Sequence, residues 1–175
     1  FHDNYKDFLK SALDNGGFYI SRYEIGNDNE IPVSKFGAKL WKNVTYDEAK
    51  KVISNMHNSE NIKCEIINGY AYDTAVNWII GENEEFTTNR IDLEKEILSG
   101  RNSNKNIYDL FDNVMELTSE TSYGNIVIRG CIGDGDNSDF KEYSYNLGFD
   151  ENVLERFLIR DTDNYYTLDI PMTFR

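Results

Sequence analysis

One loop of this chain carries the side chains best suited to binding a hard metal ion. Oxygen-bearing side chains alternate with other residues at Asp134, Asp136, Ser138 and Asp139. Calcium is bound by sets of carboxylate and hydroxyl oxygens of this kind. The segment lacks the later bidentate Glu and the fixed spacing of an EF-hand loop. Two interpretations therefore stay open, a calcium-binding loop or a solvated acidic turn.

Residues 133–166 have a composition that indicates ligand recognition. Tyrosine supplies contact area at low entropic cost and Asn adapts its hydrogen bonds, so both are favoured in recognition loops. Acidic side chains among them suit a neutral glycan or a basic protein surface. Ordinary solvated loops are the alternative. The predicted ligand-binding residues are Asp134, Asp136, Asn137, Asp139, Tyr143, Tyr145, Arg160, Asp161, Asp163 and Tyr165.

The sequence contains no recognisable catalytic motif. Cys64 and Cys131 are too few for a disulfide framework and too far apart for a zinc knuckle, so we expect free thiols. His2 and His57 are isolated from each other and from any nucleophile motif. Paired carboxylates are plentiful in so acidic a chain and carry little information. We therefore predict no catalytic residues and no enzyme activity.

Length and charge narrow the class of protein. A chain of 175 residues predicts a single domain over residues 1–175. The 31 acidic and 18 basic residues give a net charge of −13, which repels phosphate backbones and anionic lipids. Nucleic acid partners and direct membrane insertion are therefore not expected. Because the chain begins at Phe1 without a Met, we expect it to be the C-terminal part of a larger protein.

Hydrophobic patterns predict the elements that would position these loops. Apolar spacing predicts a helix over residues 5–13 that stops at Gly16 and Gly17. An aromatic-rich, alternating segment predicts a strand over residues 18–25. Residues 26–36 are expected to form a loop.

Two further helices and two further strands are predicted in the rest of the chain. Thr45 and Glu48 form a capping box that opens a second helix. Apolar residues predict a third helix over residues 72–80. Strands are predicted over residues 126–128 and 165–170, with residues 81–105 as an insertion-tolerant excursion. Since strands and helices do not alternate regularly, the predicted fold class is α+β.

Four segments follow one known family pattern in order and spacing. They read G-G-F-Y-I-S-R-Y-E at residues 16–24, N-I-Y-D-L-F-D-N-V-M-E-L-T at 106–118, I-R-G at 128–130 and T-F-R at 173–175. The chain thereby resembles the formylglycine-generating-enzyme-like (sulfatase-modifying-factor) branch of the C-type-lectin fold. That family shows G-G-F-Y-I-G-R-Y-E, N-V-Y-D-M-A-G-N-V-W-E-W-T, R-G-G-S and G-F-R. The resemblance implies short mixed or antiparallel sheets, two to three helices, long loops on one face and chain ends that pair near one another.

The resemblance does not carry over the family's oxidase chemistry. In catalytic members, two cysteines shortly after R-G-G-S bind copper as thiolates. Here residues 132–145 contain no cysteine, and Cys131 occupies the position of the motif's second Gly. Without two convergent thiolates a soft metal lacks its ligands. We therefore expect no copper and no cysteine oxidation.

Calcium is the cofactor that the resemblance implies. Asn113 and Glu116 match the Asn and Glu of the family's N-V-W-E-W segment, where calcium often lies. This chain has Asp112, Met115 and Leu117 where the family has Gly, Trp and Trp. Because those Trp residues pack the turn that presents the oxygens, a structural turn without metal is the alternative.

Four charged residues of the matching segments are predicted to be structural. Arg22 and Glu24 flank Tyr23 among apolar neighbours, a pattern typical of an internal salt bridge or a backbone anchor. Arg129 and Arg175 are expected to be structural for the same reason.

These features together predict a non-catalytic recognition domain, an adhesin or receptor-binding module. Gram-positive and prophage members of the resembled family often cap larger extracellular polypeptides. We therefore expect display on a bacterial surface, pilus or phage tail, with a glycan or protein ligand bound by residues 133–166. Two alternatives stay open: an enzyme that keeps the fold with unidentified catalytic residues, and a structural subunit of a filament or tail.

Overall fold

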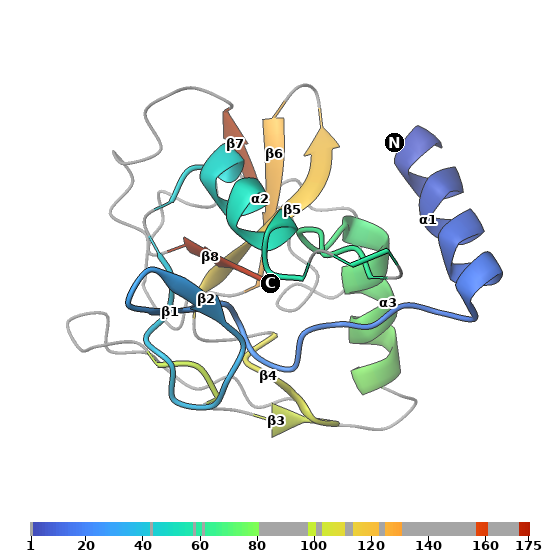
Figure 1. The fold of residues 1–175 in the computed structure, drawn as a ribbon. Helices are drawn as coiled ribbons and strands as arrows, with labels where there is room; N and C mark the ends of the chain where they lie inside the picture. Colours follow the sequence, from blue (N-terminus) through green and yellow to red (C-terminus); the bar gives the residue numbers. More distant parts are fainter. Residues whose placement is uncertain are drawn as a thin grey trace.

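The computed structural model has an α+β architecture, as predicted (Figure 1). It describes residues 2–42, 44–57, 59–60, 62–80, 98–100, 103–110, 114–122, 125–130, 157–160 and 172–175. These residues form three helices and three small sheets. The predicted strand at residues 165–170, and most of the predicted excursion at 81–105, lie outside the described residues.

The largest sheet has the strand order β7-β6-β5-β8. β5, β6 and β7 are antiparallel neighbours, whereas β8 pairs parallel to β5. β6 confirms the strand predicted at residues 126–128. The four strands are β5 (Met115–Ser122), β6 (Asn125–Arg129), β7 (Phe157–Arg160) and β8 (Met172–Phe174).

Helix α2 (Tyr46–Ser54) begins at the predicted capping box. The hydroxyl of Thr45 accepts from the backbone N–H of Glu48 at 3.2 Å, and the Glu48 carboxylate accepts from the backbone N–H of Thr45 at 2.8 Å. Ala49 and Ile53 are buried in one cluster with the apolar residues of β5 and β6. This helix therefore covers one face of the large sheet.

Helix α3 (Gly69–Ile80) starts before the predicted range of residues 72–80. Asn68 explains the earlier start, because its side-chain oxygen accepts from the backbone N–H of Ala71 at 2.9 Å and so caps the first turn. Tyr72, like most of the helix's inward-facing residues, is buried in a second apolar cluster.

Helix α1 (His2–Asn15) confirms the first predicted helix and extends it at both ends. It ends where Gly16 and Gly17 take φ values of 75° and 139°, a region that favours glycine. Phe8 holds the helix to the body through ring contacts with Phe18 and Tyr70, at centroid distances of 5.2 and 6.5 Å. α1 stands at the edge of the molecule, beyond α3 (Figure 1).

The predicted loop at residues 26–36 is wrong, because it contains a hairpin. β1 (Gly26–Asp28) pairs antiparallel with β2 (Ile31–Val33). The joining residues Asn29 and Glu30 both have positive φ, 54° and 65°, which is the geometry of the primed turn that matches strand twist. A turn without glycine gives no strong sequence signal. A second short hairpin joins β3 (Ser103–Asn104) to β4 (Ile107–Tyr108).

The predicted strand at residues 18–25 is also wrong. This segment forms no ladder, because its backbone groups bond one at a time to different parts of the chain. The carbonyl of Arg22 accepts from Tyr108 at 2.8 Å, and the N–H of Ile25 donates to Phe174 at 2.9 Å. The second bond brings the segment after α1 against β8, so the two ends of the fold lie together. None of the helices among the described residues is both long and apolar enough to span a bilayer.

Candidate functional site

Strand β5 has one apolar and one charged face, as alternation along a strand allows. Met115 and Leu117 belong to the apolar cluster that contains α2, while Glu116 between them faces the opposite side. The sheet register places Glu116 directly across from Arg129 of β6. Both residues are 0% exposed. Charged side chains therefore occupy the interior on the α3 side of the sheet.

The first group of interior charges surrounds Arg175, the residue after β8. Its Nε and Nη2 atoms donate to Oε1 of Glu116 at 3.0 and 2.8 Å. Glu24 and Asp109 are also buried, and Glu24 acts electrostatically on Arg175 and Asp109 on Glu116. We call these four residues the Arg175 centre. They join the N-terminal region, the segment after β4, strand β5 and the end of β8.

Arg175 also binds main-chain groups from distant segments. Its Nη1 donates to the carbonyl of Ser21 at 2.9 Å, and its Nη2 donates to the carbonyl of Tyr108 at 2.6 Å. Its own carbonyl accepts from the N–H of Ile67 at 3.1 Å. One side chain thus binds two partly buried carbonyls and a buried carboxylate together, which confirms the structural role predicted for it.

The second group of interior charges surrounds Arg129 at the end of β6. Its Nη2 forms an ion pair with Asp73 of α3, and its Nη1 lies 3.5 Å from Oε2 of Glu120. The guanidinium stacks over the ring of Tyr72, 4.6 Å from its centroid. We call these four residues the Arg129 centre. Its arginine is fully buried, but the side chain of Asp73 is 30% exposed.

A bulge in β5 delivers Glu120 to this centre. The register between β5 and β6 shifts between Leu117 and Thr121, so β5 carries extra residues. Thr118 stabilises the bulge, because its hydroxyl donates to the backbone carbonyl of Val127 at 2.6 Å. The Glu120 carboxylate then packs against Gly69, the first residue of α3, where a Cβ atom would collide with it. A carboxylate at a helix N-terminus is favoured by the helix dipole.

Burial shifts the protonation equilibria in both centres. Desolvation raises the pKa of Glu116 above its ordinary value, and Arg175 opposes this shift. For Arg175, burial is the largest influence and works to lower the pKa, but the charge and hydrogen bonds of Glu116, together with the charges of Glu24 and Tyr72, raise the pKa. Burial raises the pKa of Tyr72, whose hydroxyl donates to the carbonyl of Leu110 at 2.6 Å. Tyr72 links the centres, since charges of both act on it.

The described residues alone do not provide a calcium site. Of the two predicted ligands, Asn113 lies outside the described residues. Glu116 Oε2 is buried without a hydrogen-bond partner among the described groups, but Oε1 is held by Arg175, whose positive charge repels a cation. In the described part of the chain, no three His, Cys, Asp or Glu side chains form a group that could hold a metal ion.

Most predicted ligand-binding residues cannot be placed. The segments 131–156 and 161–171 lie outside the described residues, and they contain every predicted ligand-binding residue except Arg160. Arg160 ends β7, where its backbone pairs with Asn125. Cys131 is likewise outside, and Cys64 is a half-buried free thiol.

Of the two roles predicted for Arg22 and Glu24, the internal salt bridge is wrong, whereas the backbone of Arg22 does anchor the segment. Glu24 is 0% exposed, but Arg22 is exposed and contributes its backbone carbonyl to the bond with Tyr108. Residues two apart share a face where the backbone is extended as in a strand, and residues 18–25 do not form a strand.

Sequence reasoning missed Asp73, Glu120 and Tyr72 as partners of Arg129. Asp73 lies 56 positions from Arg129, and Glu120 reaches it only because of the bulge. The sequence offered one signal. Asp73 follows Tyr72 in a helix that is otherwise without charged residues, and an acidic residue in such a helix suggests a buried partner.

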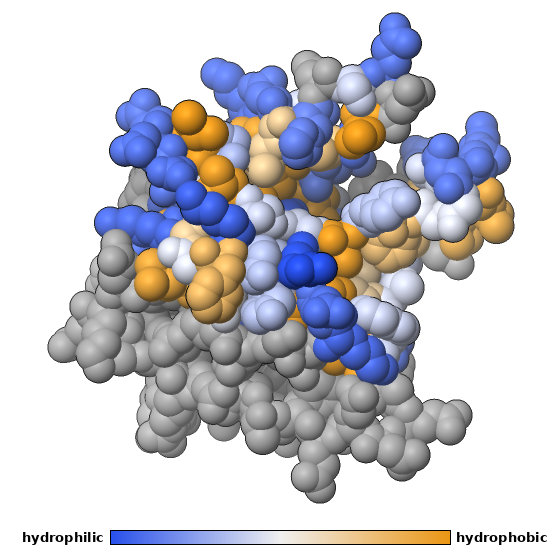
Figure 2. All heavy atoms as spheres, turned by 60° about the horizontal axis from the view of Figure 1, so that its bottom comes forward, coloured by the Kyte–Doolittle hydropathy of each residue, from blue (hydrophilic) through white to orange (hydrophobic). Residues whose placement is uncertain are grey.

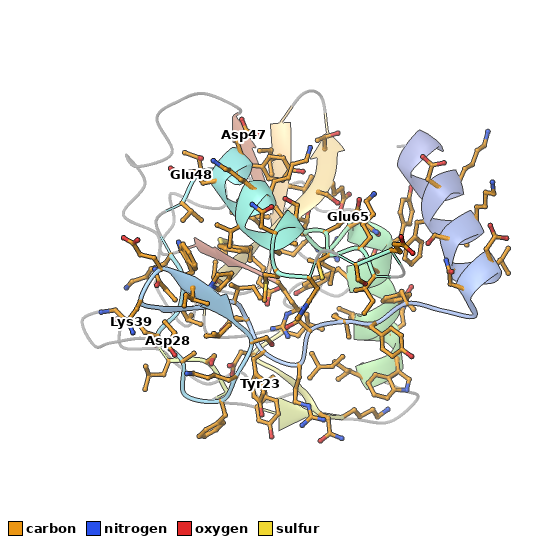
Figure 3. The ribbon with its side chains drawn as sticks, viewed as in Figure 1. Tyr23, Asp28, Lys39, Asp47, Glu48 and Glu65 are labelled. Carbon is orange, nitrogen blue, oxygen red and sulfur yellow. The ribbon has the colours of Figure 1, made fainter. Side chains whose placement is uncertain are left out.

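The surface carries separate charged and aromatic groups. Asp28, Asp47 and Glu65 come from three different segments and do not converge (Figure 3). Figure 2 shows small hydrophobic groups interspersed with hydrophilic residues on the face that it presents. Tyr19 is fully exposed, and Trp78 is 55% exposed with Lys105 5.5 Å from its ring centroid.

Comparisons with family models, with curated proteins and with solved structures return no match to this chain.

Proposed function

We propose that this chain is a non-catalytic recognition domain of the C-type-lectin-like, formylglycine-generating-enzyme-like kind, which binds a glycan or a protein through residues 133–166. The connection between β6 and β7 carries the proposal. These strands are hydrogen-bonded antiparallel neighbours, with Ile128 opposite Phe157. A turn of a few residues would join them. The chain uses residues 130–156 instead, and connections of that length are commonly functional.

The base of this connection supports the same proposal. Arg129, the last residue of β6, is buried and held by Asp73 and Glu120. The other end of the connection enters β7, which is paired to β6 along its length. Recognition proteins commonly carry variable binding loops on a scaffold of this kind. Residues 130–156 also contain most of the predicted ligand-binding side chains, including Tyr143 and Tyr145.

The cellular setting is part of the proposal. The family resemblance favours display outside the cell, on a bacterial surface, a pilus or a phage tail. Calcium is the proposed accessory ion, with Asp134 and its neighbouring oxygens as ligands, because Glu116, the other predicted ligand beside Asn113, is already held by Arg175.

The test is binding of the purified, labelled chain to an array of neutral oligosaccharides, and to intact cells before and after protease treatment of those cells. Tyr143→Ala and Tyr145→Ala should weaken binding on whichever arm responds. Tyr19→Ala is the matched control, because Tyr19 is fully exposed and lies outside residues 133–166. Equal binding by all three variants and the parent would place the ligand surface elsewhere. No binding on either arm would favour the enzyme or the structural subunit.

Thermal unfolding with added calcium and with EDTA tests the accessory ion. A ligand that binds only the folded state at 100 times its dissociation constant adds about 2.7 kcal/mol to the free energy of unfolding. A calcium-specific rise in Tm, lost in EDTA, supports the ion. An unchanged Tm removes it without affecting the binding test.

A further inference from the structure

We propose that Asn15–Gly16 is a spontaneous modification site, at which cyclisation and hydrolysis convert Asn15 to aspartate or isoaspartate and loosen the last turn of α1. The inference is independent of the proposed recognition function. It rests on a comparison of the two Asn-Gly pairs in the described residues, Asn15–Gly16 and Asn68–Gly69, which have opposite surroundings.

The reaction needs only the chain and water. The backbone nitrogen of Gly16 loses its proton and attacks Cγ of Asn15, the new N–Cγ bond closes a five-membered succinimide, and the Cγ–Nδ2 bond breaks. Nδ2 leaves as ammonia with the proton that the backbone nitrogen gave up. Water then opens one of the two ring C–N bonds, which yields aspartate or isoaspartate. A glycine after the Asn favours ring closure because no Cβ hinders the approach.

The surroundings of Asn15 are open, and its side chain is held only by hydrogen bonds to the exposed Ser11. Asn15 is the last residue of α1 and is exposed, as are Gly16 and Gly17. A Cβ built on either glycine would meet no atom within 4 Å, so the space around the two glycines is open. Helix ends fray, which allows the carboxamide to reach the next nitrogen.

Asn68 has the same successor but is held in place. Its side-chain oxygen accepts from the N–H of Ala71 at 2.9 Å, and its carbonyl accepts from the N–H of Tyr72 at 2.9 Å. Gly69 is buried with the Glu120 carboxylate against it. Ring closure at Asn68 would therefore break the cap of α3 and disturb the Arg129 centre.

Conversion of Asn15 changes what holds the end of α1. Its Nδ2 now donates to the carbonyl of Ser11 at 2.8 Å. A carboxylate has no donor for that carbonyl, and it places a second negative charge beside Asp14 at the negative end of the helix dipole. The last turn of α1 contains no basic residue to offset the charge. Isoaspartate also lengthens the main chain by one carbon.

The first experiment follows both sites by peptide mapping during incubation of the native chain at mildly alkaline pH. We expect Asn15 to convert at least an order of magnitude faster than Asn68, with aspartate and isoaspartate both formed. In denaturant the two rates should approach each other, because the dipeptides are identical. Equal rates in the native chain, or faster conversion at Asn68, would overturn the proposal.

The second experiment tests the consequence for α1 with two matched variants. Asn15→Asp should accelerate tryptic cleavage after Lys10, within α1. Asn68→Asp should not, since Asp also serves as an N-cap. Unchanged cleavage in Asn15→Asp would overturn the loosening of α1, and Asn15→Gln should abolish conversion at that position while keeping a donor amide.

Discussion

The Arg175 centre and the Arg129 centre use the same chemistry, one arginine among carboxylates, but they differ in their contact with water and main chain. The side chains of Arg175 and Glu116 are at most 1% exposed, and Arg175 also binds the carbonyls of Ser21 and Tyr108. Arg129 is equally buried, but its partner Asp73 is 30% exposed. One centre is closed to solvent and the other reaches the surface.

This difference separates two uses of a buried charge. An intact ion pair that is closed to solvent adds little to the free energy of unfolding, because desolvation offsets the attraction. Removal of only one partner is costly, because it leaves an uncompensated buried charge. When Asp73 changes, Arg129 stays buried but keeps the Glu120 carboxylate and the Tyr72 ring, and water reaches the position of Asp73. The Arg175 centre should therefore be intolerant of substitution, and the Arg129 centre should tolerate change at its exposed partner.

The contrast is tested most strongly by Arg175→Met. Removal of the guanidinium leaves Glu116 buried and two carbonyls without donors, so we expect a loss of about 3–5 kcal/mol in the free energy of unfolding. Unpaired Glu116 would have a pKa raised further by burial, so the folded variant binds a proton more readily than the unfolded chain. Its stability should fall as pH rises above the ordinary Glu range.

Urea unfolding of this variant and the parent at about pH 5 and about pH 8 measures the effect. The deficit should be larger at the higher pH. Glu116→Leu in the Arg175→Met background should recover part of it. A deficit that is the same at both pH values and in the double variant would show that Glu116 is not the group left uncompensated.

Asp73→Asn addresses the open centre. The amide keeps an acceptor for Arg129 but loses the charge, and solvent reaches the position, so we expect a loss of about 1–2 kcal/mol. Asp28→Asn is the matched control, because Asp28 forms an exposed pair with Lys35 and should change stability very little. A loss at Asp73 as large as that in Arg175→Met would remove the distinction between the centres.

Tyr72→Phe examines the residue of the Arg129 centre on which charges of both centres act. The phenol bond to Leu110 is lost, at a cost of about 1 kcal/mol near neutral pH. Because burial raises the pKa of Tyr72, the unfolded chain ionises this group first as pH rises through about 10, and the parent loses stability there. The variant should lose less stability over that interval. Parallel pH profiles for parent and variant above neutrality would contradict the burial of the phenol.

Local signals sufficed to predict much of the fold but little of the two centres. The capping box at Thr45 and Glu48, the apolar stripes of α1 and α3, and the run that forms β6 involve neighbours in sequence, and the structure confirms them. The pairs that build the centres join residues 56 and 59 positions apart. Periodicity contains no information on such distant partners.

The errors have the same cause. Residues 18–25 alternate like a strand, but a ladder needs a partner, and β8 offers Ile25 only a single bond. The hairpin at Asn29 and Glu30 was missed because its positive φ values fall on residues other than glycine. The prediction that Arg129 and Arg175 are structural was correct. Their partners could not be predicted, because Glu120 reaches Arg129 through a bulge and Arg175 reaches Glu116 through a parallel strand, and no local pattern encodes either feature.

The bond between Arg175 and Ser21 also bears on how the chain is made. The two residues are 154 positions apart, and a ribosome releases the N-terminal partner long before the C-terminal one. Until residues 172–175 emerge, β5 has no parallel neighbour and Glu116 has no guanidinium to offset its charge. We therefore expect this carboxylate to stay hydrated in the nascent chain, and folding to be completed only after β8 leaves the exit tunnel.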